Sequence, residues 1–526
     1  NDWCPTATAL AVRDGQFLAV GDADALLDAY PNAPWIDAGG CAIVPGFIDA
    51  HAHLQELGYS LRRADLTKTT SASEVAERLQ AFATNRNLPR GAWLRGHGWD
   101  ETSWSSSEPP HRNYLDKAFP ERPVWLTRTD VHAGWANTAA LEATVGLDRL
   151  RKMNDPDGGR IERAPDGAPT GVLVDAAMPL VESHIPPPTE EQRERALTAA
   201  LRHTAHHGIT GLHDAGVDLD TIGRFRDRIV KENFPLRVYA MINGRGDTFD
   251  HFCERGPFHH PSGRLDVESV KFFADGALGS RGAALLDDYA DDPGNRGLLL
   301  HEEASFRQDV QAAVEYGFQV NTHAIGDRAN RVVLGAYEAA LQECSRPVRR
   351  PRIEHAQIVH PDDRARFGTL GAIASVQPGF VSSDWTWAAS RLGSNRLDRA
   401  YAWRSLREVG APLAFGSDAP VEPLDPIRGF YAAVTRQDAD GQPDEGWRPT
   451  ERLPRSTALH AYTQGAAYAA FQEDKVGSIA PGKRADFVVL SQDLMTVPAS
   501  RLLDTEVVAT YIDGTPAYAR NDWPAA

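Results

Sequence analysis

The sequence predicts an α/β fold built on a parallel (β/α)8 barrel of the TIM type. Three observations lead to this prediction. Eight short apolar runs lie within residues 46–420, stretches with helical periodicity lie between most of them, and both chain ends are instead rich in short β segments. Strands that alternate with helices indicate a parallel sheet, and eight of them are the number that closes such a barrel. The β-rich ends indicate a second, smaller β domain.

The composition is that of a soluble globular protein with more than one domain. The 526 residues are 42% hydrophobic and 24% charged, which is ordinary for such proteins. The formal net charge of −17 argues against a nucleic-acid partner and against an anionic membrane surface. No apolar run reaches about 18 residues, so we expect no membrane span.

The cysteines and the first residues bear on cellular location. The four cysteines are far apart and form no CxxC pair, so we expect neither a disulfide framework nor a zinc–thiolate site. A reducing, cytoplasmic location fits this pattern. The start, "NDWCPTATAL", does not resemble a signal peptide. Because the chain begins at Asn1, we also expect further residues upstream.

The two chain ends predict paired short strands. The segment "TALAVRDGQFLAVGD" holds two β-rich halves around Asp14-Gly15, which is a hairpin signal. The last 50 or so residues are similar and contain a second such turn, Asp513-Gly514. We therefore predict a β-sandwich domain made of residues 1–45 and 476–526, beside a barrel domain of residues 46–475.

The eight apolar runs are the predicted barrel strands. In order they are "GFIDAH" (46–51), "GITGLHDAG" (208–216), "LRVYAMI" (236–242), "VESVKFFADG" (267–276), "FQVNTHAIGD" (318–327), "RIEHAQIV" (352–359), "IASVQPGF" (373–380) and "PLAFGSDAP" (412–420). The interval between the first and second runs is much longer than the others. We interpret residues 58–190, approximately, as an insertion over the barrel mouth that could act as a lid.

Side chains able to bind a metal ion stand at the ends of these runs. The first run ends in His51 and His53, whose spacing places both on one side of a strand. Because the carboxyl ends of barrel strands meet at one mouth, we expect the groups that follow other runs to join them. Imidazole and carboxylate together suit Zn²⁺ first, and also Mn²⁺, Ni²⁺ or Fe²⁺. The further members of this set are Lys271 in the fourth run, His323 in the fifth, His355 in the sixth and Asp418 in the eighth.

The segments that carry these residues resemble the metal-dependent amidohydrolase superfamily. More narrowly, they resemble its branch of YtcJ-like proteins and N-substituted formamide deformylases. The resemblance implies a barrel flanked by a β-sandwich from both chain ends, one or two bound divalent ions, and a homodimer. It implies that His51, His53 and Asp418 bind the first ion, that His323 and His355 bind the second, and that Lys271, carboxylated by carbon dioxide, bridges the two. The matching segments are "VPGFIDAHAHL", "VKFFADGALGSRGA", "NTHAIGDRA", "RIEHAQ", "FGSDAPVEPLDP" and "GSIAPGKRADFVVL".

Four further residues are candidate substrate contacts. Arg281, in the glycine-rich segment "DGALGSRGA", could grip a carboxylate or carbonyl oxygen, or form a surface salt bridge. Trp99 and His132 in the insertion, and Trp385 after the seventh run, suit an organic substrate pocket, although packing would equally account for the tryptophans. His213, at the end of the second run, is expected to support the ligands rather than to bind the ion.

The predicted function is metal-dependent hydrolysis of a non-peptide C–N bond in a small amide, formamide or cyclic amide. The ion would lower the pKa of a bound water to about 7, and Asp418 would pass its proton to the leaving nitrogen. Three alternatives stay open: a one-metal deaminase of heterocycles, a non-catalytic barrel scaffold, and a sugar isomerase or lyase. A deaminase usually needs a glutamate after the fifth-run histidine, where this chain reads "HAIGD", and a scaffold would be expected to lack metal ligands.

Overall fold

The computed structural model describes residues 6–86, 91–101, 104, 109–128, 133–156 and 159–524. They divide into two compact units. The larger unit is made of Asn1–Leu57 and Ala200–Ala526, and the smaller unit is Gly58–Ala199. The larger unit therefore contains both ends of the chain and all eight predicted barrel strands.

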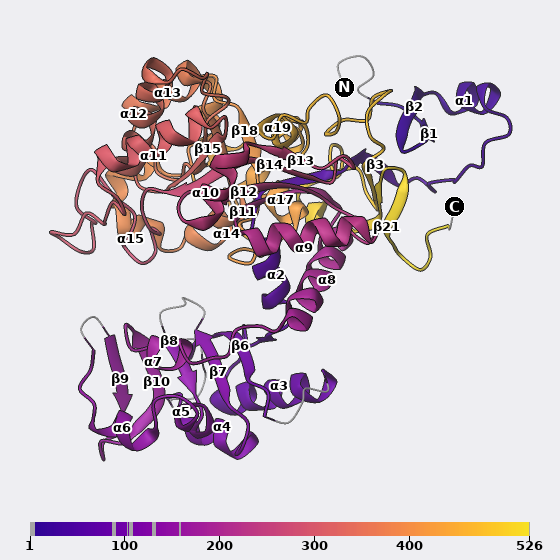
Figure 1. Ribbon diagram of the computed structural model, residues 1–526. Helices are drawn as coiled ribbons and strands as arrows, with labels where there is room; N and C mark the ends of the chain where they lie inside the picture. Colours follow the sequence, from indigo (N-terminus) through magenta and orange to yellow (C-terminus); the bar gives the residue numbers. More distant parts are fainter. Residues whose placement is uncertain are drawn as a thin grey trace. The chain divides into compact units, whose positions relative to one another are not determined.

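Eight parallel strands follow one another around the larger unit, which confirms the predicted barrel (Figure 1). Each apolar run contributes one strand. The sheet nearly closes on itself, because the Asp418 amide donates to the His51 carbonyl at 2.6 Å and the His53 amide to the Ala419 carbonyl at 2.8 Å. In order the strands are β4 (Phe47–Ala52), β11 (Ile209–Val217), β12 (Arg237–Asn243), β14 (Leu265–Phe273), β15 (Gln319–Ala324), β16 (Arg352–His355), β17 (Ile373–Val376) and β18 (Leu413–Phe415).

The barrel strands are buried on both faces, as parallel strands covered by helices must be. Every residue of β4, β16, β17 and β18 is buried. Parallel neighbours need a crossover connection, and helices supply most of these. Among them are α8 (Glu190–His206), α9 (Leu219–Val230), α10 (Asp247–Arg255), α11 (Glu303–Glu315), α12 (Asp327–Glu343), α13 (Pro361–Leu370) and α16 (Trp403–Glu408).

The two chain ends form β structure beside the barrel, as predicted. Strands β1 (Ala9–Arg13) and β2 (Gln16–Gly21) pair as a hairpin around Asp14-Gly15, whose φ angles of 53° and 75° are those of a type I′ turn. An antiparallel sheet in the order β21-β20-β19-β3 joins the start of the chain to its end. Its strands are β3 (Ala42–Pro45), β19 (Phe487–Leu490), β20 (Val507–Ile512) and β21 (Thr515–Ala519). Figure 1 shows β3 and β21 close together.

A buried ion pair links this β domain to the barrel. Arg237, the first residue of β12, donates to both carboxylate oxygens of Asp486 at 2.6 and 3.0 Å, and both side chains are almost fully buried.

Replacing Arg237 with Met would remove this partner and leave the buried Asp486 charge without it. We expect the free energy of unfolding to fall by about 3–5 kcal/mol, measured by urea denaturation. The double variant R237M/D486N should recover part of that loss, and an unchanged midpoint for R237M would contradict the prediction.

The smaller unit has a sheet of its own. Its strand order is β5-β6-β7-β8-β10-β9, with β5, β6 and β7 parallel and the remaining neighbours antiparallel. One apolar cluster includes Leu79, Trp99 and Trp135. A second cluster includes Trp125 and Leu141. The strands are β5 (Ala64–Asp65), β6 (Leu94–Trp99), β7 (Val124–Arg128), β8 (Ala133–Ala136), β9 (Gly159–Arg163) and β10 (Pro169–Asp175), and the helices are α3 (Ala72–Asn85), α4 (Arg112–Ala118), α5 (Thr138–Glu142), α6 (Leu147–Lys152) and α7 (Pro179–Glu182).

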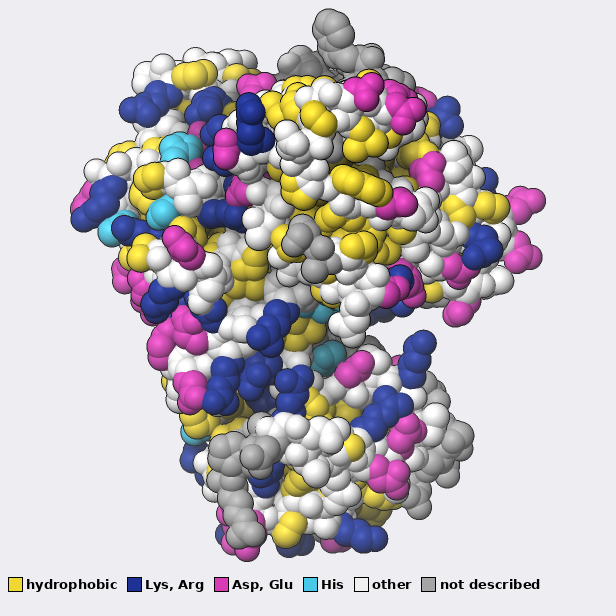
Figure 2. Space-filling view, turned by 90° about the vertical axis from the view of Figure 1, so that its right-hand side faces the viewer, with side chains coloured by type: hydrophobic (Ala, Val, Ile, Leu, Met, Phe, Trp, Pro, Cys, Tyr) yellow, Lys and Arg dark blue, Asp and Glu magenta, His cyan; other side chains and the backbone are white. Residues whose placement is uncertain are grey.

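The surface carries charges of both signs. Figure 2 shows acidic and basic side chains interspersed over one face, with hydrophobic side chains gathered on part of the larger unit. Cys41, Cys253 and Cys344 are free thiols. Among the described residues, no helix is both long enough and apolar enough to cross a bilayer.

Candidate active site

The predicted metal ligands lie at the carboxyl ends of the barrel strands. His51 is the last residue but one of β4, His323 is near the end of β15, and His355 is the last residue of β16. Asp418 follows β18, and Lys271 lies two residues before the end of β14. Because parallel strand ends converge at one mouth, these segments, far apart in sequence, are brought into one region.

Three of these side chains form a compact set of donors. The Asp418 Oδ1 atom lies 3.2 Å from His53 Nε2 and 3.6 Å from His51 Nε2. The donor atoms of all three residues lie within 4.8 Å of one another. His51 is fully buried and Asp418 is 8% exposed, whereas the His53 side chain is 28% exposed, so solvent reaches the set from the His53 side. Two imidazoles and a carboxylate at this spacing suit a divalent ion.

The remaining predicted ligands border this set. The ring centroids of His51 and His355 are 5.0 Å apart, and those of His355 and His323 are 4.5 Å apart. Lys271 Nζ lies 3.3 Å from His51 Nε2 and 4.5 Å from the centre of the Phe273 ring. All six residues predicted from the strand ends are therefore brought together at one mouth.

Hydrogen bonds place a ring proton on the Nδ1 atom of three of the imidazoles. The Nδ1 atom of His53 donates to the Ala215 carbonyl at 2.8 Å, and that of His355 contacts Gln377 Oε1 at 2.8 Å. His51 Nδ1 lies 2.5 Å from Glu354 Oε2. A carbonyl or a carboxylate can only accept, so each of these rings has a proton on Nδ1, and in the neutral rings of His51 and His355 the Nε2 lone pair is available.

His323 completes the fit to a metal ion. Its Nε2 atom is buried and has no hydrogen-bond partner among the described residues. The carboxylate oxygen of Asp275 is 3.6 Å away. A buried polar atom without a partner is costly, so its presence here points to a ligand that completes it. The donor set as a whole therefore fits a bound divalent ion.

Burial keeps the imidazoles in the form that binds metal. Burial and nearby Lys271 hold the pKa of His51 well below its usual range, and burial lowers the pKa of His323 to about 3. Burial also lowers the pKa of Lys271 to about 8. His53 differs: burial lowers its pKa, but its hydrogen bond and charge contact with Asp418 outweigh that and raise it.

Two of the predicted ligands have a strained backbone. His355 has a φ angle of 75° and Asp418 a φ angle of 61°, in the left-handed region that residues other than glycine rarely adopt. Such a conformation costs of order 1–3 kcal/mol per residue and occurs preferentially at functional sites. His355 is the last residue of β16 and Asp418 lies in the segment after β18, so the strain lies at the carboxyl ends of the strands, at the mouth.

Two buried carboxylates that the sequence analysis missed hold the ligand segments in place. Asp49 accepts from the backbone amides of His51 and Ser417, both at 3.0 Å. Asp275 accepts three backbone amides. Burial raises the pKa of each carboxyl to about 7. The sequence offered only a weak signal, a single aspartate within an otherwise mostly apolar run in each case.

The four predicted substrate contacts differ in their surroundings. Arg281 donates to both oxygens of Asp291 at 3.1 and 3.0 Å, the surface salt bridge that the sequence left open. Trp385 is half-buried and its Nε1 donates to Asp438 at 3.2 Å. Trp99 is 1% exposed in the core of the smaller unit, which leaves it almost no surface for a substrate. His132 lies outside the described residues.

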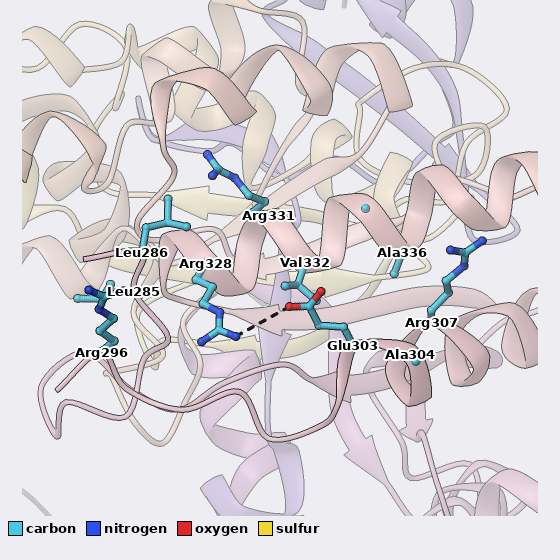
Figure 3. Close-up of a pocket in the computed structure, with 11 residues that line it drawn as sticks. Leu285, Leu286, Arg296, Glu303, Ala304, Arg307, Arg328, Arg331, Val332 and Ala336 are labelled. Atoms are coloured by element: carbon cyan, nitrogen blue, oxygen red, sulfur yellow. Dashed lines mark ion pairs between the residues drawn. The ribbon is translucent and has the colours of Figure 1, made fainter. Parts of the chain in front are cut away.

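Away from the strand ends, a cavity is lined by residues of α11, of α12 and of the segment between β14 and α11 (Figure 3). Its volume is about 600 Å³, and none of the predicted site residues lines it. Four guanidinium groups border it, and each already faces a carboxylate: Arg296 with Asp288, Arg307 with Glu343, Arg328 with Glu303 and Arg331 with Asp363. Because the arginines that border this cavity are already paired with carboxylates, we regard the barrel mouth, and not this cavity, as the site of chemistry. A smaller cavity, of about 70 Å³, is lined partly by Gly416 and Ser417, which precede Asp418 in the chain.

Comparison with known proteins identifies the family of this chain. Residues 35–518 match the amidohydrolase family. The chain belongs to the amidohydrolase family. Residues 9–33 also match an imidazolonepropionase-like composite domain of bacteria.

Several members of the amidohydrolase family are similar over nearly the whole chain. YtcJ from Bacillus subtilis is 34% identical over 98% of this chain and 96% of its own length. The N-substituted formamide deformylase of Arthrobacter pascens is 30% identical over 98% of this chain and 95% of its own. The crystal structure of an uncharacterized metal-dependent hydrolase from Pyrococcus horikoshii superimposes with a TM-score of 0.77 and 28% identity, over 94% of this chain and 95% of that one.

Proposed function

We propose that this hydrolase of the amidohydrolase family cleaves a non-peptide C–N bond in a small amide, formamide or cyclic amide. The observation that carries the proposal is the Asp418 carboxylate, buried at the barrel mouth within 3.2–3.6 Å of two imidazole Nε2 atoms. We take this carboxylate as the proton acceptor and the two imidazoles as metal donors. The similarity to an N-substituted formamide deformylase supports the bond type.

We propose that His51, His53 and Asp418 hold one divalent ion and that His323 and His355 hold a second. Zn²⁺ is the ion we expect, because nitrogen donors dominate the set. A divalent ion, when bound, acidifies a coordinated water to a pKa of about 7 and polarises a carbonyl oxygen. Burial lowers the pKa of His51, His323 and His355, so these three imidazoles would offer Nε2 without a competing proton.

Lys271 is proposed to act as a carbamate. Its Nζ is 3.3 Å from His51 Nε2, so an ammonium there would repel any cation held by His51. The neutral amine can attack carbon dioxide to form a new N–C bond, with release of one proton to solvent. The resulting carbamate would carry a negative charge in place of the positive one and would serve as an oxygen ligand to the ions, which would remove the repulsion.

Asp418 is proposed to move the proton. One of its oxygens accepts the proton of the attacking water and then delivers it to the leaving nitrogen, so that a neutral amine departs. The buried surroundings limit exchange of that proton with bulk water. Asp49 supports the arrangement, because it accepts hydrogen bonds from the backbone amides of His51 and Ser417, which belong to the two segments that carry the donors.

Metal removal is the experiment that tests this function. Dialysis against a chelator is expected to abolish hydrolysis of N-formyl and N-acyl amines, and Zn²⁺ or Mn²⁺ should restore it. Restoration in carbon-dioxide-free buffer should be slow until bicarbonate is added, because Lys271 must be carboxylated first. Release of free amine, rather than ammonia from a heterocycle, separates this proposal from a deaminase.

Full activity in metal-free protein would overturn the proposed function, and recovery that is indifferent to bicarbonate would overturn the carbamate alone. The substrate contacts at His132, Arg281, Trp99 and Trp385, the homodimer and the cytoplasmic location stay predictions.

A further inference from the structure

A closed polar network occupies the barrel interior on the Nδ1 side of the His51 ring. Its centre is Arg352 with Glu354, two residues apart on β16 and both fully buried. Residues i and i+2 of a strand point to the same side, here into the barrel. Fully buried charges of this kind are uncommon unless each is paired and hydrogen-bonded.

Arg352 is bonded to four strands of the barrel. Its Nε and Nη2 atoms donate to the two oxygens of Glu354 at 2.8 and 3.1 Å. Its Nη1 atom donates to His213 Nδ1 at 2.9 Å, so that imidazole is an acceptor. Its Nη2 atom also donates to the Ala50 carbonyl at 2.6 Å and to Ser375 Oγ at 3.0 Å. The guanidinium therefore cannot shift without disturbing β4, β11, β16 and β17.

Glu354 is fixed by this guanidinium and turns one oxygen toward His51. Glu354 Oε2 lies 2.5 Å from His51 Nδ1, and both side chains have no exposed surface. An ionised carboxylate only accepts, so the ring proton of His51 is on Nδ1 and its Nε2 lone pair faces Asp418 and Lys271. His53 and His355 bond instead to the uncharged oxygens of Ala215 and Gln377.

We propose that Glu354, held by Arg352, is a positioning residue that fixes the His51 ring and strengthens it as a nitrogen donor of the metal site. A carboxylate on the far nitrogen fixes the tautomer and orientation of an imidazole ligand and raises its basicity. Arg352 keeps the carboxylate charged and immobile, and His213 and Ser375 keep Arg352 in place. The inference rests on the proposed function, because it takes His51 as a metal ligand.

The test is the metal affinity of the apo-protein, measured by competition with a chromophoric chelator. E354Q keeps an oxygen that can accept from His51 but removes the charge, and should bind Zn²⁺ about 10–100-fold more weakly. Because E354Q leaves Arg352 as an unpaired buried charge, E354Q/R352M is measured beside it; this variant lacks both charges and should also bind weakly. The visible spectrum of the Co²⁺-loaded protein, which reports the ligands of the metal, should change in both variants.

E338Q is the matched control. Glu338 on α12 accepts from the Nε and Nη2 atoms of Arg366, both at 2.8 Å, and makes no contact with a predicted ligand. Its Zn²⁺ affinity and Co²⁺ spectrum should equal those of the unaltered protein. Wild-type affinity in folded E354Q/R352M would overturn the positioning role.

H51A separates this inference from the proposed function on which it rests. If H51A binds Zn²⁺ as tightly as the unaltered protein, the proposed metal site is wrong. If H51A binds weakly while E354Q/R352M binds normally, the metal site stands and only the role of Glu354 fails.

Discussion

Replacing Asp418 with Asn is expected to lower kcat by about 10²–10⁴-fold, the usual contribution of a positioned acid–base group. The amide has nearly the same shape as the carboxylate, and its oxygen can still face His53. It cannot take up a proton from water at neutral pH, so both proton transfers lose their carrier. The measurement is kcat for hydrolysis of an N-formyl amine at saturating Zn²⁺, with circular dichroism to follow the fold.

The control for this substitution is Asp309→Asn. Asp309 accepts from Arg245 on the surface and makes no contact with a predicted ligand, so its loss removes a carboxylate without touching the site. Its kcat should match that of the unaltered protein. If D418N with a full complement of metal turns over at the normal rate, Asp418 is not the proton carrier, although it could still be a ligand.

The barrel and its donors were predictable because their signals are local. An apolar run that ends in a metal-binding side chain reports both a buried strand and the end at which its polar group emerges. His51 and His53 illustrate this, since a two-residue spacing alone places both imidazoles on one face. The fold rule for barrels then brings the ends of distant strands together without further information.

The supporting contacts were not predictable, because each depends on a partner far away in sequence. Glu354 and His51 are 303 residues apart, and their bond requires the register of β16 relative to β4. Arg281 was a candidate substrate contact because arginine suits that role, yet the fold brings Asp291 to it. Trp99 stands in a polar sequence context, but the sheet of the smaller unit packs it against Trp104 and Trp135.

Asp275 offers the second large effect, this time on stability. It lies two residues after the end of β14. Its two oxygens accept hydrogen bonds from the backbone amides of Ile325 at 2.9 Å, Gly326 at 2.8 Å and Ala284 at 2.8 Å. The first two amides belong to the turn after β15, the strand that carries His323. One carboxylate therefore ties the end of β14 to the segment that presents a proposed ligand.

Replacing Asp275 with Asn is expected to lower the free energy of unfolding by about 2–4 kcal/mol, because one acceptor oxygen becomes an NH₂ group that faces backbone donors. The residue is 1% exposed, so water cannot take over the lost bonds. Urea denaturation gives the loss. The control is Asp288→Asn, since Asp288 also accepts a hydrogen bond from a backbone amide, that of Gly294, but lies on the surface and should matter little.

D275N should also weaken binding of the second Zn²⁺ more than binding of the first, because His323 loses its support while His51 and His53 keep theirs. Equal stability of D275N and D288N would show that the three amide bonds do not hold this segment in place.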